Sequence, residues 1–211
     1  MSKNRFNQIE DYFLNELSEE EIGHEIINGQ NTILLSAPHS VSQFREGSVK
    51  IGEYRTGLIV KLLSEQTNCH VMFKVKNLND DANYDEISNY KNDLIKYIKE
   101  NHIKLVLDLH LTSPKRDFDI EIGTGFKKNI MDREDIYNVI KKNLEKSYSD
   151  VRVDNLFPAS YPNTVSATVA KLAGIAAIQL EINFNIVSGD SELEFFNHNM
   201  VEIISELEKL L

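Results

Sequence analysis

The sequence is poor in cysteine and proline, and it has no long apolar run. Its single cysteine, Cys69, excludes an internal disulfide and any zinc site built from paired cysteines, and it fits a reducing compartment. Four prolines and nine glycines are too few for a linker-rich chain. No run approaches the roughly 18 apolar residues of a membrane-spanning helix. The start of the chain is polar and acidic and lacks the apolar stretch of a signal peptide, so we expect a cytoplasmic protein.

Positive charge is also scarce, and the formal net charge at pH 7 is −10. Such an acidic chain disfavours binding to nucleic acids and anionic membranes, because both are polyanions. A small substrate is not excluded, since a pocket can carry local charge of either sign. We therefore expect a small-molecule partner, no nucleic acid and no membrane, and the sequence leaves the oligomeric state open.

The sequence does contain a regular alternation of helical and extended patterns. Apolar runs predict buried strands at 33–35, 70–75, 103–113 and 175–185. Helical spacing of apolar residues predicts helices at 7–17, 55–66, 92–102, 132–146, 163–174 and from 191 onward. This alternation predicts one α/β domain over residues 1–211, a three-layer α/β/α sandwich with a mixed central sheet of the phosphorylase/hydrolase-like type.

Three stretches carry more local signals. Residues 26–35 contain "NGQN" and predict a β-hairpin, because Asn-Gly favours the positive φ of a tight turn. Residues 117–125, "DFDIEIGTG", alternate apolar and acidic side chains and predict a half-exposed strand. The polar stretch 40–53 is a 14-residue loop, a length that is unusual in a compact domain and more often functional.

Polar side chains end, or lie within, three of the buried strands. They are His39 in "LLSAPH", Asp108 and His110 in "LVLDLH", and Glu181 and Asn183 in "AIQLEIN". A buried polar group costs a few kcal/mol when it is unpaired, and a charge costs more. Because ligand sites of open α/β sheets lie at the carboxyl ends of the strands, we expect these side chains to converge on one site.

Two histidines and a carboxylate form a common catalytic zinc set. His39 and His110 are the candidate histidines, although a single histidine at a strand tip is more often structural. Asp108 points to the same face as His110 and lies deeper, so it can orient a ligand. The third ligand is a choice between Glu53, directly before a helix, and Glu46 in the middle of the loop. We prefer Glu53 because the following helix fixes its position.

An ordered set of motifs resembles the N-formylglutamate amidohydrolase family, a distant relative of the zinc carboxypeptidases and aspartoacylases. The motifs are "SAPHS", "GEYRTG", "DDANYDE", "LVLDLHLTSPKRDFDIEIGTG" and "PNTVSATVAKLAGIAAIQLEIN", and the resemblance runs from about Thr32 to Asn185. It implies the same three-layer fold, one zinc ion per chain bound by His39, Glu53 and His110, and Glu181 as the general base.

Two features depart from these families. Carboxypeptidases have a short His-x-x-Glu motif, whereas Glu53 follows His39 by 14 residues, which leaves Glu46 possible. Members that hydrolyse N-formylglutamate often carry an arginine after the Asp-x-Asn segment, and this chain has Tyr84 after "DAN". The second departure bears on the substrate more than on the chemistry.

We therefore expect a zinc-dependent amidohydrolase that cleaves a small N-acylated amino acid such as N-formylglutamate. Glu181 would take a proton from water and pass it to the leaving amine. Arg116 would stabilise the oxyanion or grip a substrate carboxylate, unless it forms a surface ion pair with a neighbouring aspartate. Asn83 and Asn183 could donate hydrogen bonds to the substrate. The alternatives are a carboxypeptidase-like enzyme or N-acyl amino acid deacylase, and a non-catalytic small-ligand binding module on the same fold.

Overall fold

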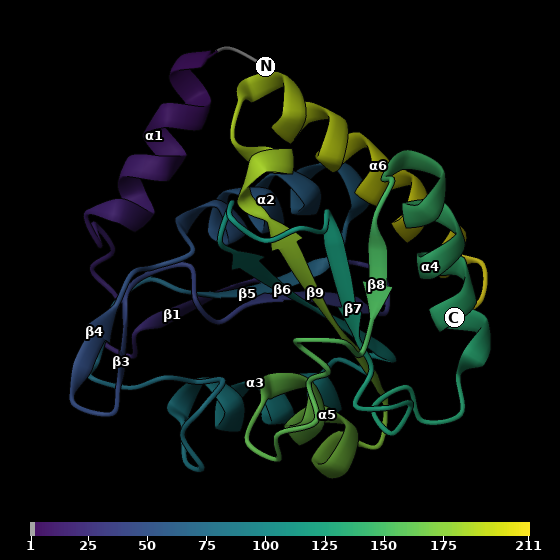
Figure 1. Cartoon of the computed structure of the whole chain (residues 1–211). Helices are drawn as coiled ribbons and strands as arrows, with labels where there is room; N and C mark the ends of the chain where they lie inside the picture. Colours follow the sequence, from purple (N-terminus) through teal and green to yellow (C-terminus); the bar gives the residue numbers. More distant parts are fainter. Residues whose placement is uncertain (1–2) are drawn as a thin grey trace.

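The computed structural model describes residues 3–211 and arranges them in three layers around a seven-stranded sheet (Figure 1). The strand order is β1-β5-β2-β6-β9-β7-β8. Neighbours pair in parallel except β1 with β5 and β7 with β9, so the sheet is mixed. This confirms the predicted fold class. The strands are β1 (His24–Ile27), β2 (Ile33–Ala37), β5 (His70–Lys74), β6 (Leu105–Thr112), β7 (Ile120–Gly123), β8 (Val151–Val153) and β9 (Ala176–Asn183).

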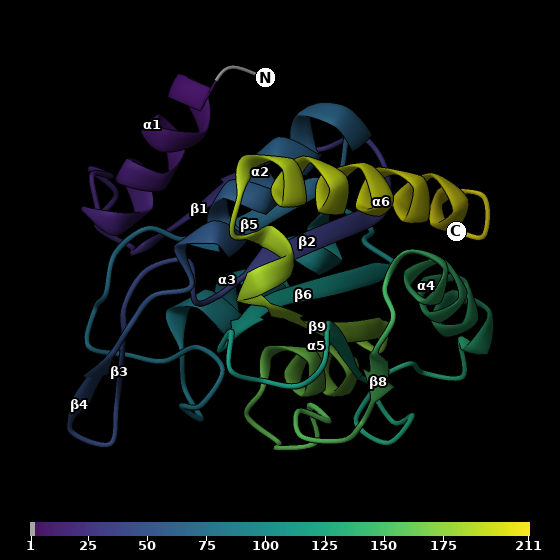
Figure 2. The same ribbon diagram turned by 45° about the horizontal axis from the view of Figure 1, so that its top comes forward.

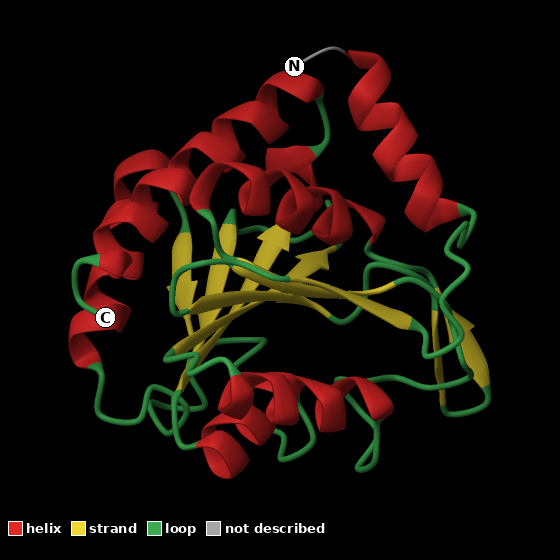
Figure 3. Ribbon diagram, turned by 180° about the vertical axis from the view of Figure 1, so that it is seen from behind, coloured by secondary structure: helices red, strands yellow, loops and turns green. Residues whose placement is uncertain are grey.

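Helices cover both faces of the sheet, and Figure 3 shows the two helical layers from behind. One layer holds α2 (Tyr54–Thr67), α4 (Glu134–Ser147) and α6 (Asp190–Glu208), with α1 (Lys3–Leu14) packed against α2. The other layer holds α3 (Asn89–Glu100) and α5 (Val165–Ala173), and a 3₁₀ turn, η1 (Phe184–Val187), follows β9. Within residues 3–211, no helix is both long and apolar enough to cross a bilayer.

The alternation of side chains along each strand builds two separate cores. In β6, Leu105, Leu107 and Leu109 face α2, α4 and α6 and belong to the larger buried cluster. Val106 points the other way, into a smaller cluster beneath α3 and α5. Because successive side chains of a strand point to opposite faces, one apolar run feeds both cores.

The predicted helix at 163–174 is confirmed as α5, together with its end signals. Thr164 caps the helix by accepting a hydrogen bond at its Oγ1 from the Ala167 N–H over 3.2 Å. Gly174 ends it with φ 69°, a left-handed conformation that glycine adopts without a Cβ clash.

Two local predictions are wrong. Strands β1 and β2 do not pair as a hairpin, because β5 lies between them and pairs with both. The strand predicted as half-exposed is β7, and all four of its residues are buried because β9 and β8 flank it and side chains pack on both faces. The 40–53 loop contains a small separate hairpin, β3 (Gln43–Arg45) and β4 (Ser48–Lys50), which projects beside the sheet (Figure 2).

Candidate metal centre and active site

The sheet brings the polar residues of three strands to one edge. His39 follows the end of β2 by two residues, and His110 lies in β6 directly opposite Glu181 of β9. β2, β6 and β9 are parallel neighbours, so their carboxyl ends meet at the same edge. The predicted convergence of these strand ends therefore follows from the strand order.

The long loop returns Glu53 to this edge. The Glu53 N–H donates to the carbonyl oxygen of His39 over 2.7 Å, which closes the loop where it began. Gly52 allows the close approach, because a Cβ there would lie 2.5 Å from the backbone of Val41. The carboxylate is fixed at its other end, where Oε2 accepts from the Leu111 N–H over 2.9 Å.

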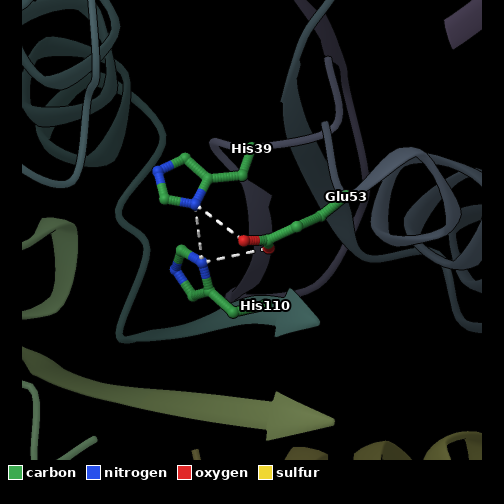
Figure 4. A group of neighbouring side chains, drawn as sticks. All are labelled: His39, Glu53 and His110. Atoms are coloured by element: carbon green, nitrogen blue, oxygen red, sulfur yellow. Dashed lines mark hydrogen bonds and ion pairs between the residues drawn. The ribbon is translucent and has the colours of Figure 1, made fainter. Parts of the chain in front are cut away.

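His39, Glu53 and His110 form a compact cluster (Figure 4). One potential ligand atom from each residue lies within 4.8 Å of the others. The Nδ1 atom of His39 is 3.0 Å from Oε1 of Glu53, and Nδ1 of His110 is 3.3 Å from Oε2. The two Nδ1 atoms are 3.2 Å apart. Glu46, the other candidate ligand, lies outside this cluster and accepts a hydrogen bond from the Tyr84 hydroxyl over 2.6 Å.

A buried aspartate holds the far nitrogen of each histidine. Nε2 of His39 is 2.9 Å from Asp81, and Nε2 of His110 is 3.1 Å from Asp108. An ionised aspartate can only accept, so Nε2 carries a proton in each ring, and Nδ1 is the atom that can bind a cation once the histidine is neutral. Both Nδ1 atoms face the Glu53 carboxylate. This donor set suits a divalent cation, and such carboxylate–histidine pairs are typical of zinc sites.

Opposite charges dominate the electrostatics of the cluster. Burial lowers the pKa of His39, but the charge of Glu53 and the hydrogen bond to Asp81 outweigh it and raise the pKa to about 8. Burial raises the pKa of Glu53, yet the two histidines lower it to about 2. These pKa shifts favour protonated histidines beside an ionised Glu53 in the metal-free cluster, and a bound cation would take the place of the histidine protons at Nδ1.

Glu181 lies beside the cluster on the wall of a cavity of about 550 Å³. Burial is the main reason that the pKa of its carboxyl is raised to about 7, with His110 opposing the rise and Glu53 adding to it. The Gln179 amide donates to Oε1 of Glu181 over 2.9 Å. A carboxylate with a pKa near neutrality can take up and release a proton at physiological pH.

Of the other predicted site residues, two line the cavity and one does not. Arg116 and Asn83 both line the cavity. The Arg116 guanidinium forms no ion pair within residues 3–211 and lies 5.6 Å from the centre of the Phe157 ring. Asn183 does not line the cavity, because its amide donates to the backbone carbonyls of Arg116 and Phe118 and its oxygen accepts from the Asn185 N–H. It organises the chain that follows β9.

Sequence reasoning missed Asp81 and the cavity residues Gln179, Arg45 and Tyr161. Asp81 lies in the loop between β5 and α3, where no periodic pattern marks it, and the "DDAN" motif was its only signal. Arg45 binds Oδ2 of Asp81 with its Nη2 at 2.7 Å and so links the β3–β4 hairpin to the partner of His39.

Comparison with models of known protein families gave no match, and no curated protein matched the sequence. Solved structures are similar in fold. A bacteriophage poly-gamma-glutamate hydrolase is 12% identical with a TM-score of 0.57, covering 93% of this chain and 95% of that one. A metallo-carboxypeptidase from Burkholderia cenocepacia is 9% identical with a TM-score of 0.60, covering 100% of this chain and 71% of that one. The catalytic domain of an N-acetylmuramoyl-L-alanine amidase from Bacillus (Paenibacillus) polymyxa is 12% identical with a TM-score of 0.51, covering 86% and 100%. The chain therefore has the fold of these amidases and carboxypeptidases, and the resemblance to the N-formylglutamate amidohydrolases stays a prediction.

Proposed function

We propose that this protein is a zinc-dependent hydrolase that cleaves the amide bond of a small N-acylated amino acid. The observation that carries the proposal is the arrangement of His39, Glu53 and His110 beside the buried Glu181 in one cavity. We assign one zinc ion per chain to the two Nδ1 atoms and the Glu53 carboxylate. A zinc ion held there would supply a Lewis acid toward the substrate carbonyl and lower the pKa of water.

Glu181 is the proposed general base. Its carboxylate lies on the strand next to His110 and is held by Gln179, so it is oriented toward the edge where the three ligands meet. It takes the proton of the attacking water as the carbon–oxygen bond forms. It then gives that proton to the amide nitrogen as the carbon–nitrogen bond breaks and the amine leaves.

Substrate binding is assigned to Arg116 and Asn83. The Arg116 guanidinium forms no close ion pair among the described side chains, and it contributes only after Arg152 to lowering the pKa of exposed Asp117. It therefore remains available to an anionic group of the substrate. The Asn83 oxygen accepts from the Val165 N–H over 2.7 Å, which leaves its amide hydrogens for the cavity. Arg116 suits an acidic amino acid such as glutamate, in a protein that is otherwise strongly negative, whereas Arg45 of the same cavity is already paired with Asp81.

The fold supports a second candidate within the same chemistry. The similar structures include enzymes named as carboxypeptidases and as amidases, so a terminal peptide bond is the alternative target. A non-catalytic binding module is the third, and a buried base beside the metal ligands argues against it. N-formyl, N-acetyl and peptide derivatives of glutamate and alanine would distinguish these substrates.

The experiment measures zinc by elemental analysis and hydrolysis of this panel by the purified protein and by Glu181→Gln. We expect about one zinc per chain in both proteins, and a kcat at least about 100-fold lower in the variant, because a positioned acid–base group contributes roughly 10²–10⁴-fold. Glu46→Gln is the matched control, because Glu46 belongs neither to the metal cluster nor to the cavity. Full activity of Glu181→Gln on a substrate that the protein cleaves would remove Glu181 as the base. Protein without metal or activity would favour the binding module.

A further inference from the structure

A second buried glutamate lies next to the proposed base. Glu121 of β7 pairs directly with Glu181 of β9, so the two side chains share one face of the sheet. Glu121 is fully buried and forms no ion pair within residues 3–211. It does not line the cavity. A buried carboxylate without a cationic partner is costly, so its remaining contacts should explain why it is there.

Those contacts are two backbone amides. Oε1 of Glu121 accepts from the Asn155 N–H over 2.8 Å and from the Phe157 N–H over 2.6 Å. Both amides belong to residues 155–161, which connect β8 toward α5 and are called the wall segment below (Figure 1). Five consecutive residues of the wall segment, Phe157 to Tyr161, line the cavity. Glu121 therefore does not contact the cavity itself, but it holds the backbone of the segment that forms the cavity wall.

Neighbouring residues of β7 and the following turn hold the same segment. The Gly125 N–H donates to the Pro158 carbonyl over 2.6 Å, and the Asn129 amide donates to the Ala159 carbonyl over 2.9 Å. A Cβ at Gly123 would lie 2.5 Å from the Phe157 carbonyl oxygen, so only glycine lets the segment pass this closely. Ala159 itself has φ 54°, a left-handed conformation that is uncommon outside glycine. The wall is thus fixed at several points in one conformation.

The surface that the wall presents is largely apolar. Phe157, Ala159 and Tyr161 face the cavity, and the Tyr161 ring stacks on Tyr84 at 5.8 Å between centres. A formyl group alone would leave most of the roughly 550 Å³ cavity unfilled. Pockets of this size usually bind a ligand through apolar and aromatic walls with a few polar groups.

We propose that Glu121 is a positioning residue that holds the wall segment against an apolar or aromatic group of the substrate next to the scissile amide. This rests on the proposed function for its kinetic test, although binding can be measured without turnover. Removing the carboxylate takes away the common acceptor of the Asn155 and Phe157 N–H groups and frees the wall. The loss should fall on binding of the apolar group and spare the metal ligands, which the wall does not hold.

The test compares Glu121→Leu with Asp119→Leu. Asp119 is a matched control because its Oδ2 also accepts two backbone N–H groups, those of Ser149 and Asp150, at 3.0 and 3.1 Å. Its loop does not line the cavity. The substrates are N-acetylalanine, N-benzoylalanine and N-acetylphenylalanine. We expect Glu121→Leu to raise KM about tenfold for an aromatic substrate, because two hydrogen bonds from the wall to a carboxylate oxygen are lost. Its kcat, its zinc content and its KM for N-acetylalanine should stay close to those of the wild type, and Asp119→Leu should leave every KM unchanged.

Glu121→Gln keeps an acceptor oxygen and should restore KM. If Glu121→Leu does not fold, Asn129→Ala loosens the same wall and should raise the same KM. The binding arm titrates N-benzoylalanine and N-acetylphenylalanine calorimetrically into Glu181→Gln with and without Glu121→Leu. Weaker binding of the aromatic compounds by the double variant would support the role of Glu121 in holding the wall segment, even if no compound is hydrolysed. The absence of hydrolysis would count only against the proposed function. Equal losses for small and aromatic compounds, or equal effects of Glu121→Leu and Asp119→Leu, would overturn the proposal.

Discussion

Alternate residues of strands β6 and β9 point to opposite faces of the sheet, and the two faces differ in composition. The face toward α2, α4 and α6 is apolar along its whole length, with four leucines in β6 at positions 105, 107, 109 and 111 and three aliphatic residues in β9 at 178, 180 and 182. The face toward α3 and α5 begins with Val106 and Ala177 and then becomes polar. Its later residues are Asp108, His110, Gln179, Glu181 and Asn183.

This difference separates stability from chemistry within a single strand. Replacing a residue on the apolar face changes packing, and replacing its neighbour on the polar face changes the site. Adjacent residues 109 and 110 therefore offer a direct comparison, because both are almost completely buried and they point in opposite directions.

The largest effect is expected at the ligands. His110→Ala and Glu53→Ala should weaken zinc binding more than about 100-fold, because even the outer partners of metal ligands are worth roughly 10–100-fold. Calorimetric zinc titration of the purified proteins measures this. Glu46→Ala is the control and should bind zinc like the wild type, since Glu46 contacts Tyr84 and lies outside the cluster. Zinc binding lost in Glu46→Ala and kept in Glu53→Ala would reverse the assignment of the third ligand.

On the opposite face, Leu109→Ala should lower the free energy of unfolding by about 2–5 kcal/mol, the range for removing a fully buried leucine. Leu109 is inaccessible to solvent in the larger core. Urea unfolding of the metal-free protein measures the loss, and zinc titration of the folded variant should give wild-type affinity. A variant of normal stability with weakened zinc binding would show that the two faces are not separate.

The sequence predicted the strands that carry this contrast better than it predicted their partners. The runs containing Leu109 and Leu180 were assigned as buried strands, and β6 and β9 confirm this. The supposed hairpin at 26–35 failed because its turn signal is local, whereas β5, which separates the two strands, comes some forty residues later in the chain. Strand partners depend on contacts distant in sequence, which a local pattern does not contain.

The same limit of local sequence patterns applies to the candidate site. His39, His110 and Glu181 were predicted as site residues because a polar residue in a buried apolar run needs an explanation, and all three line one cavity in the structure. Asp81 was missed because a loop aspartate is unremarkable in sequence, and only the fold places it on His39. Asn183 was expected in the cavity, yet its amide is used by neighbouring backbone carbonyls. A side chain's residue type is visible in the sequence, but the direction in which it points is not.

The smallest effect is expected from Asp108→Asn, on the polar face but one step behind the ligands. Asp108 is fully buried and holds Nε2 of His110, so its charge fixes the tautomer that leaves Nδ1 free. An asparagine oxygen can still accept the Nε2–H, so the ring orientation should survive while the negative charge is lost. We expect zinc affinity to fall about tenfold, the low end of the range for such partners. The zinc affinity of Asp81→Asn should fall further, because Asp81 also binds Arg45 and the Asn83 N–H. Neutralising Asp81 would release the β3–β4 hairpin as well as His39. Zinc titration of both variants at constant pH and ionic strength gives the order. If Asp108→Asn bound zinc as tightly as the wild type, the carboxylate would belong with the leucines of the opposite face as a structural residue, and the polar face would contribute to the metal centre only through its direct ligands.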